Sequence, residues 1–444
     1  MQGQTRRHRF HRIVIARSIK QVCRRGDRQV IRVNSADDVE CGELAKRRLA
    51  SDVLVRGETD LLALQAEFDA LEGVSDNDDM DRKPTKHRDN SDKSSADGGS
   101  CHSRRAVLRY GASLGAAGLL ASPAWGAKSR ASDRTKASVE KGLQWVARTQ
   151  SKNGRWTANN YPAAMTALAG TTLLCSGSTT TQGPYAKNIR RAVDYLVDQV
   201  RENGLIGDPD RDNRYTYGHG FSMLFLSQVL GEEEDADRRR DLVNVLTKAA
   251  QFSGKAQTRS GGWGYVSAKD GNNFDEGSTT ITQVQGLRGC RNAGIPVSGD
   301  VIDRAKKYIY KCKNKDGGIS YSFSNRGSSR PAITAAALAA LFNAGDYDSK
   351  HVPEMMKYCK DKLYRLNNSQ SFGHWHYTYL YYGQVVYREG GETWRKFRDN
   401  LYARIVGEQQ TDGQWTGNIG PIYVTAINLT VLQLENGFLP IYQR

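Results

Sequence analysis

The chain has 444 residues, 38% of them hydrophobic and 25% charged, and its 64 Lys and Arg against 48 Asp and Glu give a formal charge of +16 at pH 7. Such a charge favours acidic partners, namely anionic membrane surfaces or acidic glycans, although a solvated surface of Lys and Arg is the simpler interpretation. No nucleic-acid-binding motif accompanies the charge, so we expect no nucleic-acid partner.

Residues 1–102 carry no pattern of a folded domain. Residues 1–32 hold ten Lys and Arg against one acid, residues 33–79 are acidic, and residues 81–103 are polar without apolar periodicity. This composition predicts a disordered leader over residues 1–102. Because a start at Met80 would give the next segment an ordinary leader, we expect residues 1–79 to be a gene-start artefact.

Residues 103–127 read SRRAVLRYGASLGAAGLLASPAWGA and combine the pair Arg104 and Arg105 with a short apolar run rich in Gly and Ala. This pattern is typical of a twin-arginine signal peptide, with cleavage near residues 124–127. The apolar run is too short to span a bilayer comfortably. The sequence therefore predicts export by the twin-arginine route to a periplasmic or extracellular location.

After the signal, one short pattern occurs six times. A charged helical segment leads into a Gly-containing turn, and a segment rich in Ala, Gly and Thr with few charges follows it. Six such hairpins predict two concentric rings, with the charged helices outside and the apolar helices inside. The turns fall at Gly154–Trp156, Asn203–Leu205, Gly261–Trp263, Asp316–Ile319, Phe372–Trp375 and Asp412–Trp415.

The first copy of the pattern, KGLQWVARTQSKNGRW at residues 141–156, resembles the QW repeat of squalene and oxidosqualene cyclases and of protein prenyltransferase β-subunits. The resemblance covers residues 136–444 and implies an all-α (α/α)6 toroid, in which the repeat's Gln satisfies backbone groups at a helix end and its Trp covers them. From Tyr377 onward the chain is similar to bacterial, exported squalene-cyclase-like proteins of unassigned activity. The later copies keep Ala305, Tyr308 and Gly317, with Lys313 in the Gln slot and Ile319 in the Trp slot, then Leu366, Gln370, Gly373 and Trp375, then Ile405, Gln409, Gly413 and Trp415.

The family's catalytic motifs are not in the expected places. The DxDD pattern of the protonating cyclases occurs once, at residues 76–79 of the leader, whereas Asn273, Asp275 and Glu276 stand at the start of the third inner helix. The Asp-x-Cys that contributes zinc ligands in prenyltransferases does not occur in the toroid, and His374 and His376 have no third ligand at a fixed spacing. We therefore expect no metal and no cofactor, and a terpenoid cyclase (isomerase) or prenyltransferase-like activity stays an open question.

The starts of the inner helices should converge on one mouth of the ring, where aromatic faces can hold an isoprenoid chain or stabilise a carbocation. The alternative roles are structural: Asp275 and Glu276 as acids at a helix N-terminus, and the histidines as turn residues. The predicted catalytic residues are Asp275, Glu276, His219 and His376, and the predicted substrate-binding residues are Tyr161, Tyr215, Tyr217, Arg330, His374, Trp375, Tyr377 and Tyr423.

Together these features predict an exported repeat protein that binds or transforms an isoprenoid- or terpenoid-type apolar ligand in a central aromatic cavity. Two alternatives stay open: an acidic-polysaccharide lyase or glycan-binding toroid, and a noncatalytic interaction scaffold. The sequence also leaves open the oligomeric state and whether the four cysteines after the signal are disulfide-bonded or free thiols; these are Cys175, Cys290, Cys312 and Cys359.

Overall fold

The computed structural model describes residues 123–366 and 374–443, with side chains from residue 132 onward, and all of them belong to one compact unit. The predicted leader and residues 103–122 of the predicted signal lie outside this range, as do Gln370 and Gly373 of the fifth turn. Residues 124–127, where we place the cleavage site, fall in the first turns of helix α4. The leader, the gene start and the cleavage site therefore stay predictions.

Twelve α-helices alternate between two kinds along the described chain. The helices that precede each turn are α4 (Pro123–Arg148), α6 (Ala186–Asp198), α8 (Ala236–Ala256), α10 (Gly299–Cys312), α12 (Val352–Leu363) and α14 (Gly391–Gly407). The helices that follow each turn are α5 (Pro162–Leu174), α7 (Tyr215–Glu232), α9 (Gly277–Asn292), α11 (Pro331–Asn343), α13 (Trp375–Glu389) and α15 (Pro421–Leu432). Two short 3-10 helices come last, η1 (Leu434–Asn436) and η2 (Pro440–Tyr442).

The two kinds of helix differ in how much of their surface is buried. Helix α6 buries a single stripe that includes Ile189, Val193 and Leu196, as an amphipathic surface helix does. Helix α5 instead is buried at every position from Ala163 to Leu174, as a helix surrounded by neighbours requires. The apolar helices therefore form an inner ring, and the charged helices cover it.

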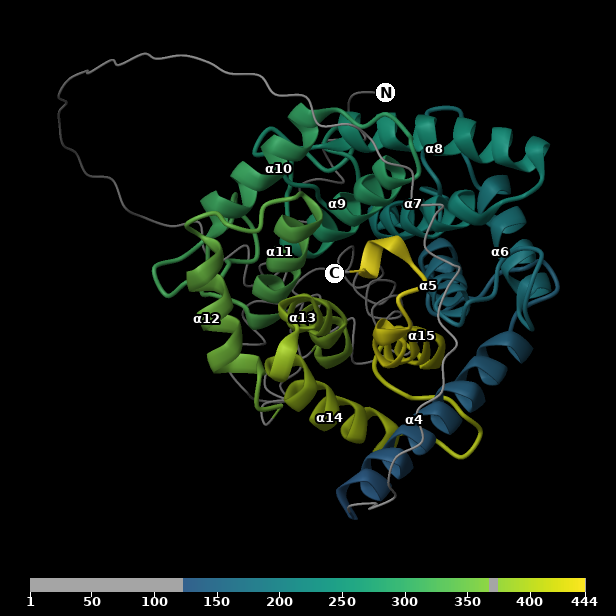
Figure 1. Cartoon of the computed structure of the whole chain (residues 1–444). Coiled ribbons are helices and arrows are strands. Elements are labelled where there is room, and N and C mark those ends of the chain that lie inside the picture. The colour runs from purple at the N-terminus through teal and green to yellow at the C-terminus, as the bar shows by residue number, and fades with distance from the viewer. Residues whose placement is uncertain (1–122, 367–373, 444) are drawn as a thin grey trace, which may run out of the picture. The chain divides into compact units, whose positions relative to one another are not determined.

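The inner ring closes on itself. Helix α5 packs against α7, α7 against α9, α9 against α11, α11 against α13, α13 against α15, and α15 returns to α5, while α14 contacts α4 in the outer ring. Figure 1 shows the inner helices surrounded by the outer ones. The predicted all-α toroid of six hairpins in two rings is confirmed.

Glycines hold the repeat turns against the next outer helix. A Cβ on Gly154 (φ +86°) would lie 2.2 Å from the carbonyl oxygen of Arg191, a contact that no side chain can make. The turns at residues 204, 261 and 317 have the same geometry. At Gly413 (φ +101°) the neighbouring carbonyl, 2.5 Å from such a Cβ, belongs to Lys141, so this turn joins the last hairpin to the first.

The Gln and Trp of the repeat have the predicted structural roles. Gln150 donates through Nε2 to the carbonyl oxygens of Gly154 (2.7 Å) and Asn188 (2.9 Å), which ties its turn to the start of α6. Trp156 Nε1 donates to the Val146 carbonyl (2.9 Å). The third and sixth repeats form the same bonds with Gln257 and Trp263 and with Gln409 and Trp415.

The four cysteines of the toroid are all free and buried. Burial raises the pKa of Cys290 and of Cys312 to about 12, so these thiols stay protonated at neutral pH. They serve as small apolar core residues. Separately, none of the described helices combines the length and apolar character that a membrane span needs.

Candidate functional site

The six inner helices begin at the same end of the ring because each follows its outer helix through an equivalent turn. Their N-terminal ends carry partial positive charge. The residues that cap these ends differ from repeat to repeat, unlike the residues of the turns. They are Tyr161, Arg214, Glu276, Arg330, His374 and Gly420.

Six half-buried tyrosines gather at this end, and we call them the tyrosine cluster. The Tyr217 and Tyr265 rings lie 6.0 Å apart between centroids, and the Tyr265 hydroxyl is hydrogen-bonded to the Tyr321 hydroxyl. Tyr377 reaches across from α13 and donates to the carbonyl oxygen of Ser278 on α9 (3.4 Å). The cluster consists of Tyr161, Tyr217, Tyr265, Tyr321, Tyr377 and Tyr423.

Four members of the cluster are predicted from the sequence, whereas Tyr265 and Tyr321 are not. Both lie in loops between a turn and an inner helix, and each stands four residues after its turn glycine, Gly261 or Gly317. That shared position is a signal in the sequence. It could have identified them because equivalent loop positions of neighbouring repeats lie close together.

Glu276 lies under the cluster with no exposed surface. It caps α9, and its carboxylate accepts hydrogen bonds from the Thr279 amide (2.6 Å), the Ser278 amide (2.8 Å), the Ser278 hydroxyl (2.6 Å) and the Tyr217 hydroxyl (3.3 Å). Burial raises the pKa of Glu276, although the bonds from Ser278 and Thr279 act in the opposite direction. Glu276 therefore holds a proton at a higher pH than an exposed glutamate does.

Two arginines flank the cluster. The Arg214 guanidinium lies 4.4 Å from the Tyr265 ring centroid, and that of Arg330 lies 4.8 Å from the Tyr321 ring centroid. Among the described residues, neither guanidinium is paired with a carboxylate. Arg330 is a predicted site residue, whereas Arg214 was missed. His374 belongs to the same region, since burial lowers its pKa and the charge of Arg330 lowers it further.

Asp275 faces away from the cluster. Its Oδ1 accepts hydrogen bonds from the Tyr308 hydroxyl (3.0 Å), the Ser322 hydroxyl (2.9 Å) and the Phe323 amide (2.8 Å), and its Oδ2 accepts from the Ser260 hydroxyl (2.8 Å). All four donors belong to α10 and to two loops, and none of them belongs to the tyrosine cluster. These contacts favour a structural role for Asp275, which joins α10 to two loops.

Both ring nitrogens of His219 have partners in the scaffold. Its Nδ1 accepts from the Ile206 amide (3.1 Å), its Nε2 lies 3.2 Å from the Ala249 carbonyl oxygen, and burial lowers its pKa to about 4. In the first and sixth repeats a threonine accepts the equivalent amide bond: Trp156 donates to Thr166 and Trp415 to Thr425. His219 therefore accepts the bond that a threonine accepts in other repeats. Because both of its ring nitrogens have scaffold partners, neither is free for catalysis.

Three further predicted residues contact the scaffold instead of the cluster. The Tyr215 hydroxyl donates to Asp270 (2.6 Å). Trp375 packs against Tyr379 with 4.7 Å between ring centroids. His376 Nδ1 lies 3.1 Å from Asn428 Oδ1, between α13 and α15, and burial lowers the pKa of His376.

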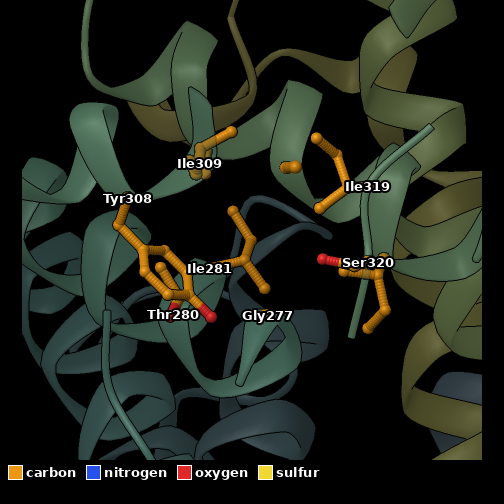
Figure 2. A pocket seen from close by; sticks show the side chains of 10 residues that line it. Gly277, Thr280, Ile281, Tyr308, Ile309, Ile319 and Ser320 are labelled. Carbon is orange, nitrogen blue, oxygen red and sulfur yellow. The ribbon is translucent and has the colours of Figure 1, made fainter. Parts of the chain in front are cut away.

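Side chains cross the interior of the ring at two levels. Tyr377 bonds Ser278, and deeper in the ring Gln285 Nε2 donates to Gln384 Oε1 (2.7 Å); both bonds join α9 to α13, which are not neighbours in the ring. One cavity, of about 10 Å3, lies among α9, α10 and α11 and is lined by Ile281, Tyr308 and Ile319 (Figure 2). A second, of about 20 Å3, lies beside η2. The first has room for at most one water and the second for one or two, and neither has room for an isoprenoid chain.

The part of the chain that the structure describes has no group of three or more His, Cys, Asp or Glu placed to hold a metal ion. The site therefore consists of phenols, two guanidiniums, an imidazole and one buried carboxyl group. Such a set can bind apolar and cationic groups on the ring faces, bind anions at the arginines, and supply a proton from Glu276.

No protein-family model and no curated protein matches the sequence. Among solved structures, the type II terpene cyclase MstE from Scytonema, in complex with geranylgeranyl dihydroxybenzoate, is 12% identical over 70% of this chain and 99% of that chain, with a TM-score of 0.47. Apo MstE is 13% identical over 69% of this chain and 99% of that chain (TM-score 0.31), and a protein from Actinoplanes is 14% identical over 67% and 98% (TM-score 0.25). The chain is similar to these structures, while its assignment as a toroid rests on its own helix contacts.

Proposed function

We propose that the protein binds an isoprenoid- or terpenoid-type ligand at the N-terminal end of its inner ring and that Glu276 protonates this ligand. The proposal rests on the tyrosine cluster around the buried carboxyl group of Glu276, the pKa of which is raised by burial. Tyrosine faces bind apolar chains and stabilise positive charge next to them. A carboxyl group with a raised pKa is a suitable general acid.

The contacts of Glu276 supply a route for the proton. The Ser278 hydroxyl and the Tyr217 hydroxyl are hydrogen-bonded to each other, and both contact the carboxylate. They lie between Glu276 and the half-buried face of the cluster. In the proposed step a carbon–carbon double bond of the ligand takes the proton, a C–H bond forms from its π electrons, and the neighbouring carbon becomes cationic. The Ser278 and Thr279 amides then stabilise the carboxylate.

A pair of variants at adjacent positions tests this function. Glu276→Gln removes the acid, while Asp275→Asn changes the neighbouring carboxyl group that faces away. With farnesol and geranylgeraniol as probes, calorimetry should show that Glu276→Gln still binds, and mass spectrometry should show that it forms no product. Product formation by Glu276→Gln at the wild-type rate would rule Glu276 out as the acid, and absence of binding to the wild-type protein would rule out the ligand class.

Arg214 and Arg330 favour a second candidate function, binding or cleavage of an acidic polysaccharide. Both guanidiniums lack a carboxylate partner among the described residues and lie on tyrosine rings that can stack on sugars. This function predicts that oligouronates bind the wild-type protein, that added salt weakens binding, and that Arg214→Gln with Arg330→Gln abolishes it. Calorimetry that detects farnesol binding and no oligouronate binding would exclude this candidate.

We also propose export by the twin-arginine route, on the strength of Arg104 and Arg105 before a short apolar run. Changing both arginines to lysine should leave the unprocessed precursor in the cytoplasm of the producing cell. N-terminal sequencing of the wild-type protein from the periplasm should then find a start near residues 124–127. Equal processing of both proteins would contradict the proposal.

A further inference from the structure

Residues 437–443, which we call the tail segment, cross the other end of the inner ring, where the inner helices finish. The Ile441 amide donates to Gln228 Oε1 on α7 (3.4 Å), and Arg388 on α13 donates to the Gln443 carbonyl oxygen (3.4 Å). Helix η2 within this segment packs against α9. Figure 1 shows the end of the chain among the inner helices. The tail segment therefore closes this end of the ring.

The tail segment inserts apolar side chains into the ring. Leu439 is 7% exposed and Ile441 and Tyr442 are 8% exposed, whereas Phe438, next to them in the chain, is 55% exposed. Both hydrogen bonds that join the segment to α7 and α13 are 3.4 Å long, near the limit for a hydrogen bond. The segment is thus held mainly by burial of apolar surface, which another apolar molecule can replace.

The space around the inserted side chains is imperfectly filled. The cavity of about 20 Å3 lies between Ile441 and Tyr442 of the tail segment and Phe342, Gln384 and Arg388 of α11 and α13. Removing the Ile441 and Tyr442 side chains would join their volume to this cavity. The enlarged space would have the dimensions of a short aliphatic chain and would lie beside Phe342, Gln384 and Arg388.

Tyr381 provides a polar group in the same part of the ring. Its side chain is fully buried, and its hydroxyl has no hydrogen-bond partner among the described residues. Burial raises the pKa of Tyr381 well above its usual value, and the neighbouring Tyr423 and Tyr442 phenols raise it further. A buried hydroxyl without a partner is destabilising. A ligand oxygen that accepts a hydrogen bond from Tyr381 would remove this free-energy penalty.

We propose that Leu439, Ile441 and Tyr442 occupy a ligand site, from which an isoprenoid-type chain with a hydrogen-bond acceptor for Tyr381 displaces the tail segment. The ligand class rests on the proposed function; the location of the site does not. Gly437 is the hinge for this displacement. It has a φ of +65°, and no atom lies within 4 Å of the place where a Cβ would stand.

The first test compares farnesol binding by calorimetry in three proteins. The double variant Ile441→Ala with Tyr442→Ala removes two of the three occupying side chains without removing backbone and should bind farnesol about tenfold more tightly than the wild type, because farnesol then has less apolar surface to displace. Phe438→Ala is the matched control, since its side chain is exposed, and should bind like the wild type. Unchanged affinity in a double variant that keeps its helical circular dichroism would overturn the inference.

Two further measurements keep the result interpretable if the double variant unfolds. In the wild type, hydrogen exchange at the Ile441 and Tyr442 amides should become faster when farnesol binds, and unchanged or slower exchange would overturn the inference. As a single substitution in the wild type, Tyr381→Phe should weaken farnesol binding about fivefold, because it removes one hydrogen bond, and unchanged affinity would overturn the inference.

Farnesol binding by Tyr217→Phe, compared with that of the tail variants, separates this inference from the proposed function. Farnesol affinity that depends on Tyr217 and not on the tail segment would overturn the inference and leave the proposed function standing. Farnesol affinity that depends on the tail segment and not on Tyr217 would support the inference and overturn the proposed function.

Discussion

The repeat turns and the tyrosine cluster lie only a few residues apart in the chain, yet they differ in kind. In the first, third and sixth turns, a Gly, a Gln and a Trp recur, and the Gln Nε2 and Trp Nε1 groups donate to equivalent carbonyl oxygens within or next to their own repeat. At the starts of the inner helices the capping residue instead differs from repeat to repeat, and two of these caps, Arg214 and Arg330, lie on tyrosine rings of the cluster. The residues that repeat thus stabilise the ring, whereas the residues that differ between repeats lie at the candidate site.

Asp275 and Glu276 show the same difference at adjacent positions. Asp275 lies in the turn layer and is surrounded by four donors from α10 and from two loops. Glu276 caps an inner helix and contacts the phenol of Tyr217. One peptide unit separates a carboxylate that holds loops together from a carboxyl group suited to chemistry.

Gly413→Ala should cause the largest loss of stability. A Cβ at this position would lie 2.5 Å from the Lys141 carbonyl oxygen, in a backbone conformation with φ +101°, where the ring closes. We expect the free energy of unfolding in urea to fall by about 3 kcal/mol. Gly345→Ala is the control, since φ there is +80° and no atom lies near the added Cβ, so it should cost about 1 kcal/mol. Equal losses would show that the destabilisation comes from backbone strain and not from a lost contact between the turn and the next outer helix.

His219 should make the free energy of unfolding depend on pH. Because burial lowers its pKa in the folded protein to about 4, the unfolded chain binds the proton first as pH falls below the usual histidine value of about 6.5. The free energy of unfolding should therefore decrease as pH falls from 6.5 to 4, by about 3 kcal/mol at the lower limit, and be unaffected by His219 above 6.5. His219→Thr, which restores the residue of other repeats, should remove this part of the dependence. An identical pH profile in both proteins would contradict the assignment.

Asp275→Asn should destabilise the protein more than Glu276→Gln. The Asn amide group would face a hydroxyl or amide donor that the carboxylate now accepts from, so we expect a loss of about 2 kcal/mol in the free energy of unfolding. Glu276→Gln weakens a helix cap and should cost about 1 kcal/mol. Chemical denaturation of both variants gives the comparison directly, and a larger loss at Glu276 would reverse the roles assigned to the two residues.

The pH dependence of activity should identify Glu276. A general acid must be protonated, so turnover should be highest below the raised pKa of Glu276 and fall as pH rises through it. The sign for stability is the same, because a raised folded pKa stabilises the protein at low pH and this contribution is lost as pH rises. Tyr217→Phe, which removes one donor to the carboxylate, should move the falling limb of the turnover profile to higher pH. A profile that does not move would mean that another group titrates.

Much of the fold was predictable because its determinants are local. The charged and apolar segments alternate with helical periodicity, and each turn carries its own Gly, so the order and number of hairpins could be derived without tertiary information. Tyr161, Tyr217, Glu276, Arg330 and Tyr377 were also placed at the correct end, because residues at the start of equivalent helices converge in any closed ring.

The rest of the site could not be predicted in this way. Tyr215 and Tyr217 are two residues apart, and only the rotation of α7 about its axis sends the first toward Asp270 and the second toward the cluster. Tyr265 and Arg214 join the site through a stacking contact between a loop and a helix cap. Such contacts depend on distances between segments far apart in the chain, which no local pattern encodes.

Three features are encoded in local sequence: the alternation of helices, the Gly, Gln and Trp chemistry of the turns and, through their repetition, a closed double ring. Each of these follows from interactions within a repeat or between identical neighbours. Tertiary packing sets three others: which of two adjacent acids faces the tyrosines, the bridge between Gln285 and Gln384 across the ring, and the position of Tyr442 at its far end. These features arise from packing between unlike repeats, where the rotation of a helix or the path of a loop sets the contact.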